Sequence, residues 1–231
     1  MLKIAWLALG LFSAAAQAAP QQIYLEYEVY RNGNMLGSVT DTFIRSGNQY
    51  RLVSEMHATG PLKALWPGKV RLESRGDVTP QGLQPLQFQH ARSEAPNKLA
   101  TASLDWKLQQ VRFQHKDRST LRDGLQPGTQ DQLSMLYQFA FMPRLPTDYT
   151  LQIVSGKGLN EHHYARSDGG QIRTPAGQFA TEHYQRVGQA ADDKSVDLWI
   201  APARHNLPVQ VRISEDGDTF VQRLVRYRVK G

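Results

Sequence analysis

The sequence of 231 residues contains no cysteine. This absence excludes disulfide bonds and catalysis by a thiolate. Apolar residues make up 40% of the chain and charged residues 21%, as in ordinary globular proteins, which argues against both a disordered chain and a polytopic membrane protein. Packing and backbone hydrogen bonds must therefore hold the fold together without covalent cross-links.

Long hydrophobic runs are also missing, except near the N-terminus. Lys3 precedes an apolar run from Ile4 to Ala16, and Ala16-Gln17-Ala18 places small residues at the −3 and −1 positions of a signal peptidase site. The run is shorter than the roughly 20 residues that cross a bilayer. We expect a Sec-type signal peptide at residues 1–18, cleaved after Ala18, and an uncleaved N-terminal anchor is the alternative. No cysteine follows the run, so a lipid anchor is not expected either.

Acidic residues are fewer than basic ones. The net charge is +6, and loss of Lys3 with the signal peptide reduces it to +5. A basic exported domain can meet anionic lipids, lipopolysaccharide or cell-wall polymers, although solubility alone also explains the charge. Nucleic acid is not an expected partner, because the predicted compartment largely excludes it.

Alternation of apolar and polar residues with period two dominates residues 19–231, which we expect to form a single β-rich domain and a monomer. In Ile23 to Val29 the odd positions are apolar, and Asn32-Gly33 then marks a tight turn. Short turn-like connections favour a large antiparallel sheet, which tends to curl. The expected strands are Ile23–Val29, Met35–Arg45, Gln49–Ala58, Lys69–Arg75, Leu86–Arg92, Leu99–Trp106, Val111–His115, Tyr149–Val154, Leu159–Arg166, Gly177–Val187, Ser195–Ile200, Pro208–Ser214 and Thr219–Val229.

One segment has helical periodicity and two apolar stripes. Thr129 and Gln132 have the spacing of a capping box, Asp131 falls in the expected first turn, and Pro143 ends the helix. A helix that is apolar on two sides is buried on two sides or lines an apolar cavity, so we expect it in the concavity of the curled sheet. The first stripe comprises Leu133, Leu136, Tyr137, Ala140 and Phe141, and the second comprises Met135, Phe139 and Met142.

Motifs of catalysis, metal binding and phosphate binding are missing from the sequence. There is no Gly-x-Ser-x-Gly elbow, no His-Glu-x-x-His, and no glycine-rich loop that opens a helix. His162 and His163 are neighbours, and on a strand they would point to opposite faces, although His183 would be able to approach one of them. We therefore predict no enzyme, no cofactor and no metal site.

Two groups of residues are candidates for binding. Leu62, Leu65 and Trp66 form an apolar loop that would cover a cavity mouth, or pack onto the core. Met135, Phe139 and Met142 would line a cavity for an acyl chain, since methionine suits adaptable apolar surfaces, or belong to the core.

Several short stretches resemble one family when taken in order. They are Ser74-Arg75-Gly76-Asp77-Val78, Gly82-Leu83-Gln84-Pro85, Asp131-Gln132-Leu133-Ser134, Thr174-Pro175-Ala176-Gly177, Asp197-Leu198-Trp199-Ile200-Ala201-Pro202 and Leu207-Pro208-Val209. With the signal peptide, they resemble the exported bacterial family described as domain of unknown function 3108. That family is similar in fold to the periplasmic lipoprotein carriers LolA and LolB. The resemblance implies an incomplete antiparallel barrel around an apolar cavity, and a periplasmic protein of a Gram-negative bacterium.

These observations leave three hypotheses of different classes. The first is a non-catalytic periplasmic protein that binds a lipid, an acyl chain or another amphiphile in a half-barrel. The second is an envelope module with a filled core that binds another protein. The third is a hydrolase acting on envelope material. An open apolar cavity in the structure would favour the first over the second.

Overall fold

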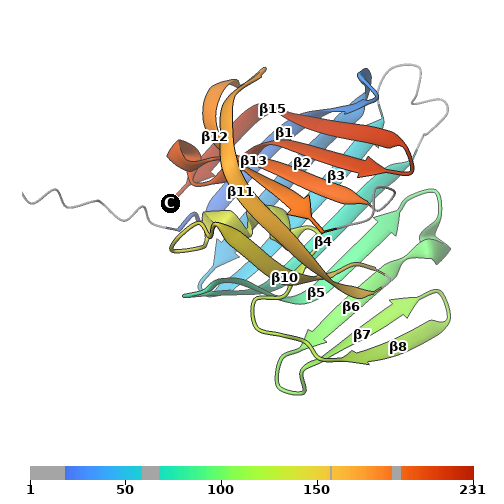
Figure 1. The fold of residues 1–231 in the computed structure, drawn as a ribbon. Helices are drawn as coiled ribbons and strands as arrows, with labels where there is room; N and C mark the ends of the chain where they lie inside the picture. The colour runs from blue at the N-terminus through green and yellow to red at the C-terminus, as the bar shows by residue number, and fades with distance from the viewer. Residues whose placement is uncertain (1–18, 59–67, 157, 189–193) are drawn as a thin grey trace, which may run out of the picture.

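The computed structural model describes residues 19–58, 68–156, 158–188 and 194–231. Fifteen strands form one sheet whose order is β8-β7-β6-β5-β4-β3-β2-β1-β15-β14-β13-β12-β11-β10-β9 (Figure 1). The first wall comprises β1 (Gln22–Arg31), β2 (Asn34–Ser46), β3 (Gln49–Ala58), β4 (Lys69–Thr79), β5 (Gly82–Arg92), β6 (Ala100–Asp105), β7 (Gln110–His115) and β8 (Arg118–Asp123). The second wall comprises β9 (Gln130–Asp131), β10 (Asp148–Val154), β11 (Leu159–Thr174), β12 (Gly177–Val187), β13 (Ser195–Ala201), β14 (Leu207–Glu215) and β15 (Asp218–Lys230).

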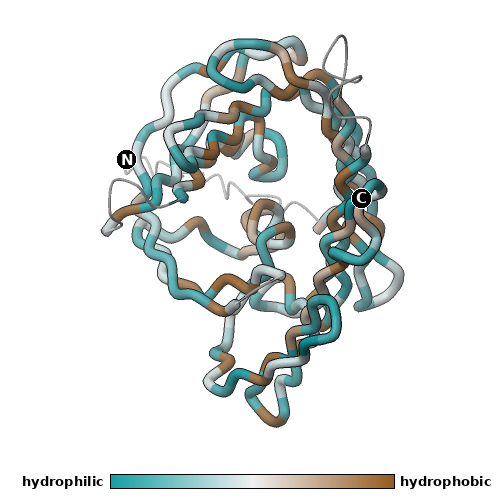
Figure 2. Tube along the Cα trace, turned by 90° about the vertical axis from the view of Figure 1, so that its right-hand side faces the viewer, coloured by the Kyte–Doolittle hydropathy of each residue, from teal (hydrophilic) through white to brown (hydrophobic). Residues whose placement is uncertain are grey.

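The sheet is mainly antiparallel and stays unclosed. β1 pairs with β15, which joins the two walls, and only the short β9 is parallel to its neighbour β10. The ends of the sheet order are β8 and β9, so the curl has two edges. Figure 2 shows the chain running round a central helical segment. The predicted large curled antiparallel sheet is therefore confirmed.

Alternation along the first strand explains which face turns inward. Ile23, Leu25 and Tyr27 are at most 1% exposed, whereas Glu26 and Glu28 between and after them are partly exposed. Because successive side chains of a strand point to opposite faces, one face of β1 lies in the core and the other faces out. Asn32 and Gly33 both have positive φ, which matches the turn predicted between β1 and β2.

The helical segment lies between the walls and is shorter than predicted. Only α2 (Ser134–Tyr137) is α-helical, and η2 (Gln138–Ala140) continues it as a 3-10 turn. Leu133, Tyr137 and Phe141 of the first stripe join the larger apolar cluster, whose members come from both walls. Met135 and Phe139 of the second stripe join a separate cluster of the second wall. The prediction of burial on two sides is confirmed.

The predicted capping box is wrong. The Thr129 hydroxyl donates to the Gln126 carbonyl at 2.7 Å, and the cap is supplied instead by Asp131. Asp131 lies in β9, before the helix, and its Oδ1 accepts the backbone N–H groups of Leu133 and Ser134 at 2.9 and 2.8 Å. A carboxylate reaching these otherwise unpaired donors performs the task expected of the threonine.

Several strands differ from the sequence-based expectation. β9 falls where the first helical turn was expected, and β4 and β5 are longer than predicted. β8 was not predicted, because all six of its residues are exposed and it shows no apolar alternation. β11 was predicted to end at Arg166 but continues to Thr174 through a bulge between Asp168 and Gly170. Short 3-10 turns complete the fold at η1 (Pro96–Lys98) and η3 (Pro202–Arg204). Over the described ranges, no helix has the length and apolar character needed to span a membrane.

Candidate ligand-binding site

Two buried carboxylates anchor the helical segment to the first wall. Oδ2 of Asp131 accepts the Ser74 hydroxyl of β4 at 2.5 Å. Asp41 of β2 accepts the Tyr137 hydroxyl of α2 at 2.5 Å. Burial raises the pKa of each carboxyl from 3.8 to about 6, and the hydrogen bonds offset this only in part. The helix is thus fixed on this side by polar contacts as well as by packing.

The second stripe of the helix faces an aromatic and aliphatic cluster on the second wall. The Phe139 ring lies 4.4 Å from the Tyr184 ring and 5.8 Å from the Tyr149 ring, measured between centroids. Of the predicted cavity-lining residues, Met135 and Phe139 are buried here and Met142 packs against the cluster from the side. Its buried members are Met135, Phe139, Leu151, Ile153, Tyr164, Tyr184, Leu198, Ile200 and Val211.

The predicted apolar loop of Leu62, Leu65 and Trp66 lies outside the described residues. Ala58 and Gly68 stand at the two ends of this segment, and both line a small apolar pocket of about 10 Å³. The pocket has room for no more than one water molecule. Its other lining residues are Val29, Leu36, Gly37, Met56, His57 and Val70.

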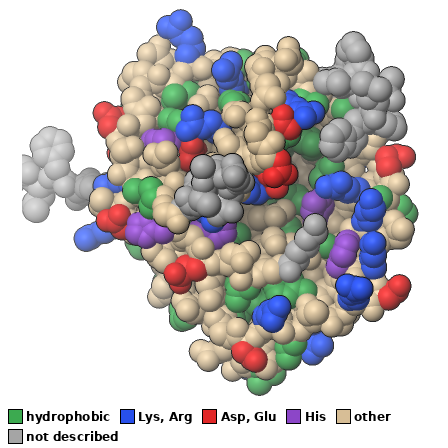
Figure 3. Space-filling model, turned by 45° about the vertical axis from the view of Figure 1, so that its right-hand side comes forward, with side chains coloured by type: hydrophobic (Ala, Val, Ile, Leu, Met, Phe, Trp, Pro, Cys, Tyr) green, Lys and Arg blue, Asp and Glu red, His purple; other side chains and the backbone are tan. Residues whose placement is uncertain are grey.

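A larger hollow opens beside the apolar cluster of the second wall. It has a volume of about 350 Å³, within the range of small-molecule sites. The side of the molecule in Figure 3 is hollowed near the centre of the view, with hydrophobic and histidine side chains around the depression. The residues lining the 350 Å³ hollow are Glu161, His162, His163, Arg186, Val187 and Gly188.

His162 connects this hollow to the apolar cluster. Its ring stacks on the ring of Tyr164 with centroids 6.4 Å apart, and Tyr164 is a buried member of the cluster. Arg186 lies directly opposite Tyr164 on β12. The Tyr164 hydroxyl and the His162 Nδ1 atom are buried, and neither has a hydrogen-bond partner in the part of the chain that is described. Buried polar groups without partners are rare in folded proteins, and each calls for a structural or functional explanation.

One basic and one acidic side chain, Arg186 and Glu161, line the hollow together with His162 and His163. Burial and, to a lesser extent, the Arg186 charge lower the pKa of His162 to about 4, so its imidazole is neutral at pH 7. An unpaired acceptor is tolerated better than an unpaired donor, which places the proton of the neutral ring on Nε2. The Nε2–H is then a donor beside the apolar cluster, and the Arg186 guanidinium, whose Nη1 donates to the Lys194 carbonyl, supplies further donors.

His163 and His183 do not converge with His162. His163 lies on the outer face, where its Nδ1 is 3.1 Å from the Thr150 hydroxyl and its Nε2 is 3.6 Å from Asp148 Oδ1. The prediction that the neighbouring histidines point apart is thus correct, but His183 pairs with Ser167 and approaches neither. No group of three or more His, Asp or Glu side chains suited to a metal occurs among the described residues.

Thr150, His163 and Asp148 present a hydroxyl, an imidazole and a carboxylate in the order of a catalytic triad. They share only this order with such a triad. Thr150 and His163 are direct cross-strand partners, and His163 and Asp148 have side-chain exposures of 44% and 71%. Ser134, a hydroxyl residue of the helical segment, is fully buried against Asp131. A nucleophile works in a site with oxyanion donors and restricted water, which an open sheet face does not offer.

Sequence reasoning missed Tyr164 and Arg186 because each appears as an ordinary strand residue. Only the register of β11 against β12 brings them together, and local alternation does not encode that register. The neighbouring His162-His163 pair was the available signal for this site, but in the sequence it suggests only a metal site.

The chain belongs to the family described as "Protein of unknown function (DUF3108)", whose model matches residues 26–225. None of the curated proteins matches the sequence. The fold is similar to a crystal structure titled "Beta-barrel-like Protein of Domain of Unknown Function DUF1849 from Brucella abortus". That comparison has a TM-score of 0.55 and 9% identity, and it covers 92% of this chain and 99% of the other. A DUF1329 family protein from Desulfovibrio piger ATCC 29098 matches with a TM-score of 0.25 and 10% identity, covering 91% of this chain and 86% of the other.

Proposed function

We propose that this protein is a non-catalytic periplasmic binding protein for an amphiphile with an anionic headgroup, such as a fatty acid or another acyl lipid. The observation that carries the proposal is the hollow of about 350 Å³, in which His162 and Arg186 border a buried apolar cluster. Charged donors beside apolar surface match a molecule with a polar head and a hydrocarbon tail.

The position of the apolar cluster supports the same assignment. Met135 and Phe139 place flexible and aromatic side chains behind Tyr164, and Met142 lies at the edge of the cluster. A tail entering past the His162–Tyr164 stack would contact this cluster, and methionine side chains adapt readily to a guest. The similarity to LolA and LolB implied by the sequence belongs to this proposal, as do the signal peptide at residues 1–18 and the periplasmic location.

A filled core favours a second candidate, an envelope module that binds another protein. Both stripes of the helical segment are packed against the walls, and the small pocket near Ala58 holds only about 10 Å³. In that case the contact surface would be the edge strand β8 or the loop at Trp66. Crosslinking in cells should then trap a defined partner, and Trp66→Ala should weaken that adduct.

The amphiphile proposal is tested on protein exported with its own leader and purified from the periplasm of a Gram-negative host. Native mass spectrometry should show a co-purifying lipid on a chain that begins at Ala19. Titration with dansyl-labelled undecanoic acid should give saturable binding with a rise in fluorescence. A ligand-free mass together with no uptake of the probe would contradict the proposal.

Variants locate the binding site. Arg186→Gln and Tyr164→Phe should each weaken binding of the probe by about tenfold, the equivalent of one charge-assisted or buried hydrogen bond. Arg112→Gln is the matched control, because Arg112 is an exposed arginine of β7 outside the hollow. Equal affinities for all three variants would place the probe elsewhere.

A further inference from the structure

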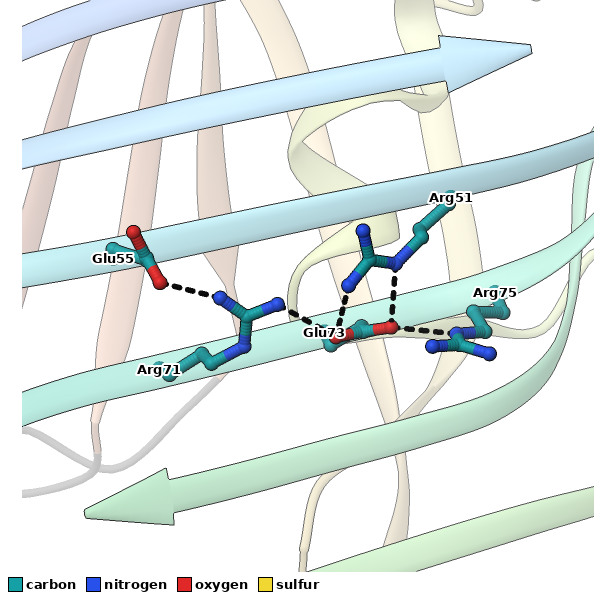
Figure 4. Close-up of polar contacts among 5 residues, drawn as sticks. All are labelled: Arg51, Glu55, Arg71, Glu73 and Arg75. Atoms are coloured by element: carbon teal, nitrogen blue, oxygen red, sulfur yellow. Dashed lines mark hydrogen bonds and ion pairs between the residues drawn. The ribbon is translucent and has the colours of Figure 1, made fainter. Parts of the chain in front are cut away.

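A cluster of three arginines and two glutamates covers the outer face of β3 and β4 (Figure 4). Arg51 and Glu55 come from β3, and the other three residues come from β4 at alternate positions. Register places Arg51 directly opposite Arg75, and Glu55 directly opposite Arg71. All five side chains therefore share one face of the sheet, away from the helical segment.

Glu73 is the centre of this cluster. Its side chain is only 9% exposed, although it lies on the outer face. Arg51 donates through Nε and Nη2 at 2.8 and 3.1 Å, and Arg75 donates through Nε at 2.5 Å. Arg71 donates to Glu73 at 2.9 Å and also pairs with Glu55. Burial raises the pKa of Glu73, but hydrogen bonds from the three guanidinium groups outweigh it and lower the pKa to about 2.

The carboxylates do not neutralise the cluster. Three guanidinium groups against two carboxylates leave one positive charge, and like charges directly opposite on neighbouring strands are unfavourable. On the other side of β4, Gln87 faces Arg75 and Gln89 faces Glu73, so no further acid caps the array there. The fold thus keeps a like-charged pair, Arg51 and Arg75, directly opposite each other, with Glu73 accepting hydrogen bonds from both.

The outward edges of Arg51 and Arg75 are free. Within the described chain, Arg75 is bonded only through Nε, and its side chain is 56% exposed. Arg51 has no partner there for Nη1, and its side chain is 48% exposed. Glu73 fixes the inner edge of each guanidinium, so the outer donors are held in place before any ligand arrives. Planar guanidinium forks arranged in this way suit the oxygens of a phosphate group.

We infer that Arg51, Arg71 and Arg75 form a binding site for a phosphate group on the outer face of the first wall. The phosphate would lie over Glu73, bridging the free nitrogens of Arg51 and Arg75, with the Gln87 and Gln89 amides beside it. The site is separate from the hollow at His162 and does not depend on the proposed function. A free phosphate and the phosphate of a lipid headgroup have the same recognition chemistry.

The experiment uses the exported protein and two probes. Inorganic phosphate is titrated by calorimetry, and vesicles of phosphatidylcholine with and without phosphatidic acid are tested by co-sedimentation. Binding of inorganic phosphate would identify a free anion as the ligand, and binding only of vesicles with phosphatidic acid would identify a lipid headgroup. Either result supports the site, and binding of neither probe would overturn it.

Matched variants separate the site from general electrostatic attraction. Arg75→Gln should weaken binding by about tenfold, whereas Arg228→Gln, which removes the same charge from the exposed surface of β15, should leave it within twofold. Arg75→Lys keeps the charge and loses the fork, so it should also weaken binding. Circular dichroism checks that each variant is folded. Equal binding by Arg75→Gln and Arg228→Gln, or a lowered melting temperature with unchanged binding, would show a structural ion-pair network only.

Discussion

Two aspartates place carboxyl groups in the interior, where ionisable side chains are uncommon. Asp41 and Asp131 are at most 3% exposed. Asp41 of the first wall accepts the Tyr137 hydroxyl of the helical segment, and Asp131, just before that segment, accepts the Ser74 hydroxyl of the first wall. No sequence pattern announced these contacts, because an aspartate on a strand or before a helix is an ordinary surface residue. Asp131 was recognised only for a favourable position near a helix start, and its partner Ser74 is 57 positions away.

Protonation of Asp41 and Asp131 should make the fold more stable as the pH falls from 7.5 to 5. Their folded pKa of about 6 exceeds the ordinary 3.8, so folding favours proton uptake. The stabilising contribution is complete below about pH 4 and is lost as the pH rises through 6. For one carboxyl, the difference between pH 5 and pH 7.5 is about 1.4 kcal/mol.

Comparison with Asp41→Asn isolates this effect. His162, with a pKa lowered to about 4, acts in the opposite direction over the same range, so the wild-type curve alone mixes both. Urea unfolding at pH 5 and 7.5 should show the variant gaining about 1.4 kcal/mol relative to wild type at the higher pH. Asp117→Asn, in the exposed turn between β7 and β8, is the control. A pH-independent difference between wild type and Asp41→Asn would contradict the assignment.

Removal of one hydroxyl should also be costly. Tyr137→Phe keeps the ring, which is fully buried, but leaves the Asp41 carboxylate without the 2.5 Å hydrogen bond. An unsatisfied buried acceptor costs about 1–3 kcal/mol, and more if it is charged. In a double-mutant cycle with Asp41→Asn, measured by urea unfolding, the two substitutions should cost less together than the sum of their separate costs. Simple additivity would show that the hydrogen bond contributes nothing.

At the scale of elements, strands and the helical segment were predictable to different degrees. Period-two alternation located the strands whose one face is buried, with Gln49–Ala58 and Gly177–Val187 found at the predicted limits. Alternation fails where both faces are exposed, as in β8, and where a bulge resets the pattern, as after Asp168 in β11. The helical stripes were correct, but the α-helix gives way to a 3-10 turn at Gln138, whose side chain accepts the distant Leu83 N–H at 2.6 Å.

The second stripe of the helical segment should matter as much as a core position. Phe139→Ala removes a ring that is 1% exposed and contacts two tyrosines, and it should destabilise the fold by about 3–5 kcal/mol. Leu121→Ala in β8, where the side chain is 44% exposed, should cost less than about 0.5 kcal/mol. Urea unfolding measures both. A small cost at Phe139 would instead indicate that its surroundings are already open to solvent or a ligand.

At the scale of the whole molecule, one sheet makes both walls. The β1–β15 pairing connects them along ten registered positions, and the helical segment packs against both. The curl itself was predictable from the number of strands, whereas the way the interior is filled depends on contacts between residues far apart in sequence. If strand pairing alone held this open sheet together, its two walls would be able to separate.

The helical segment and the shared sheet together should make the two walls unfold as one cooperative unit. Trp106 follows β6 in the first wall and donates to the Pro85 carbonyl at 2.9 Å, whereas Trp199 lies in β13 of the second wall. In protein that lacks residues 1–18 and carries Trp66→Phe, adding either Trp106→Phe or Trp199→Phe leaves one tryptophan as a reporter. Urea unfolding followed by the two reporters should give coincident transitions after correction for each substitution. Separate midpoints would mean that the walls are independent, and that the Asp41–Tyr137 and Asp131–Ser74 contacts do not couple the helix to the rest of the sheet.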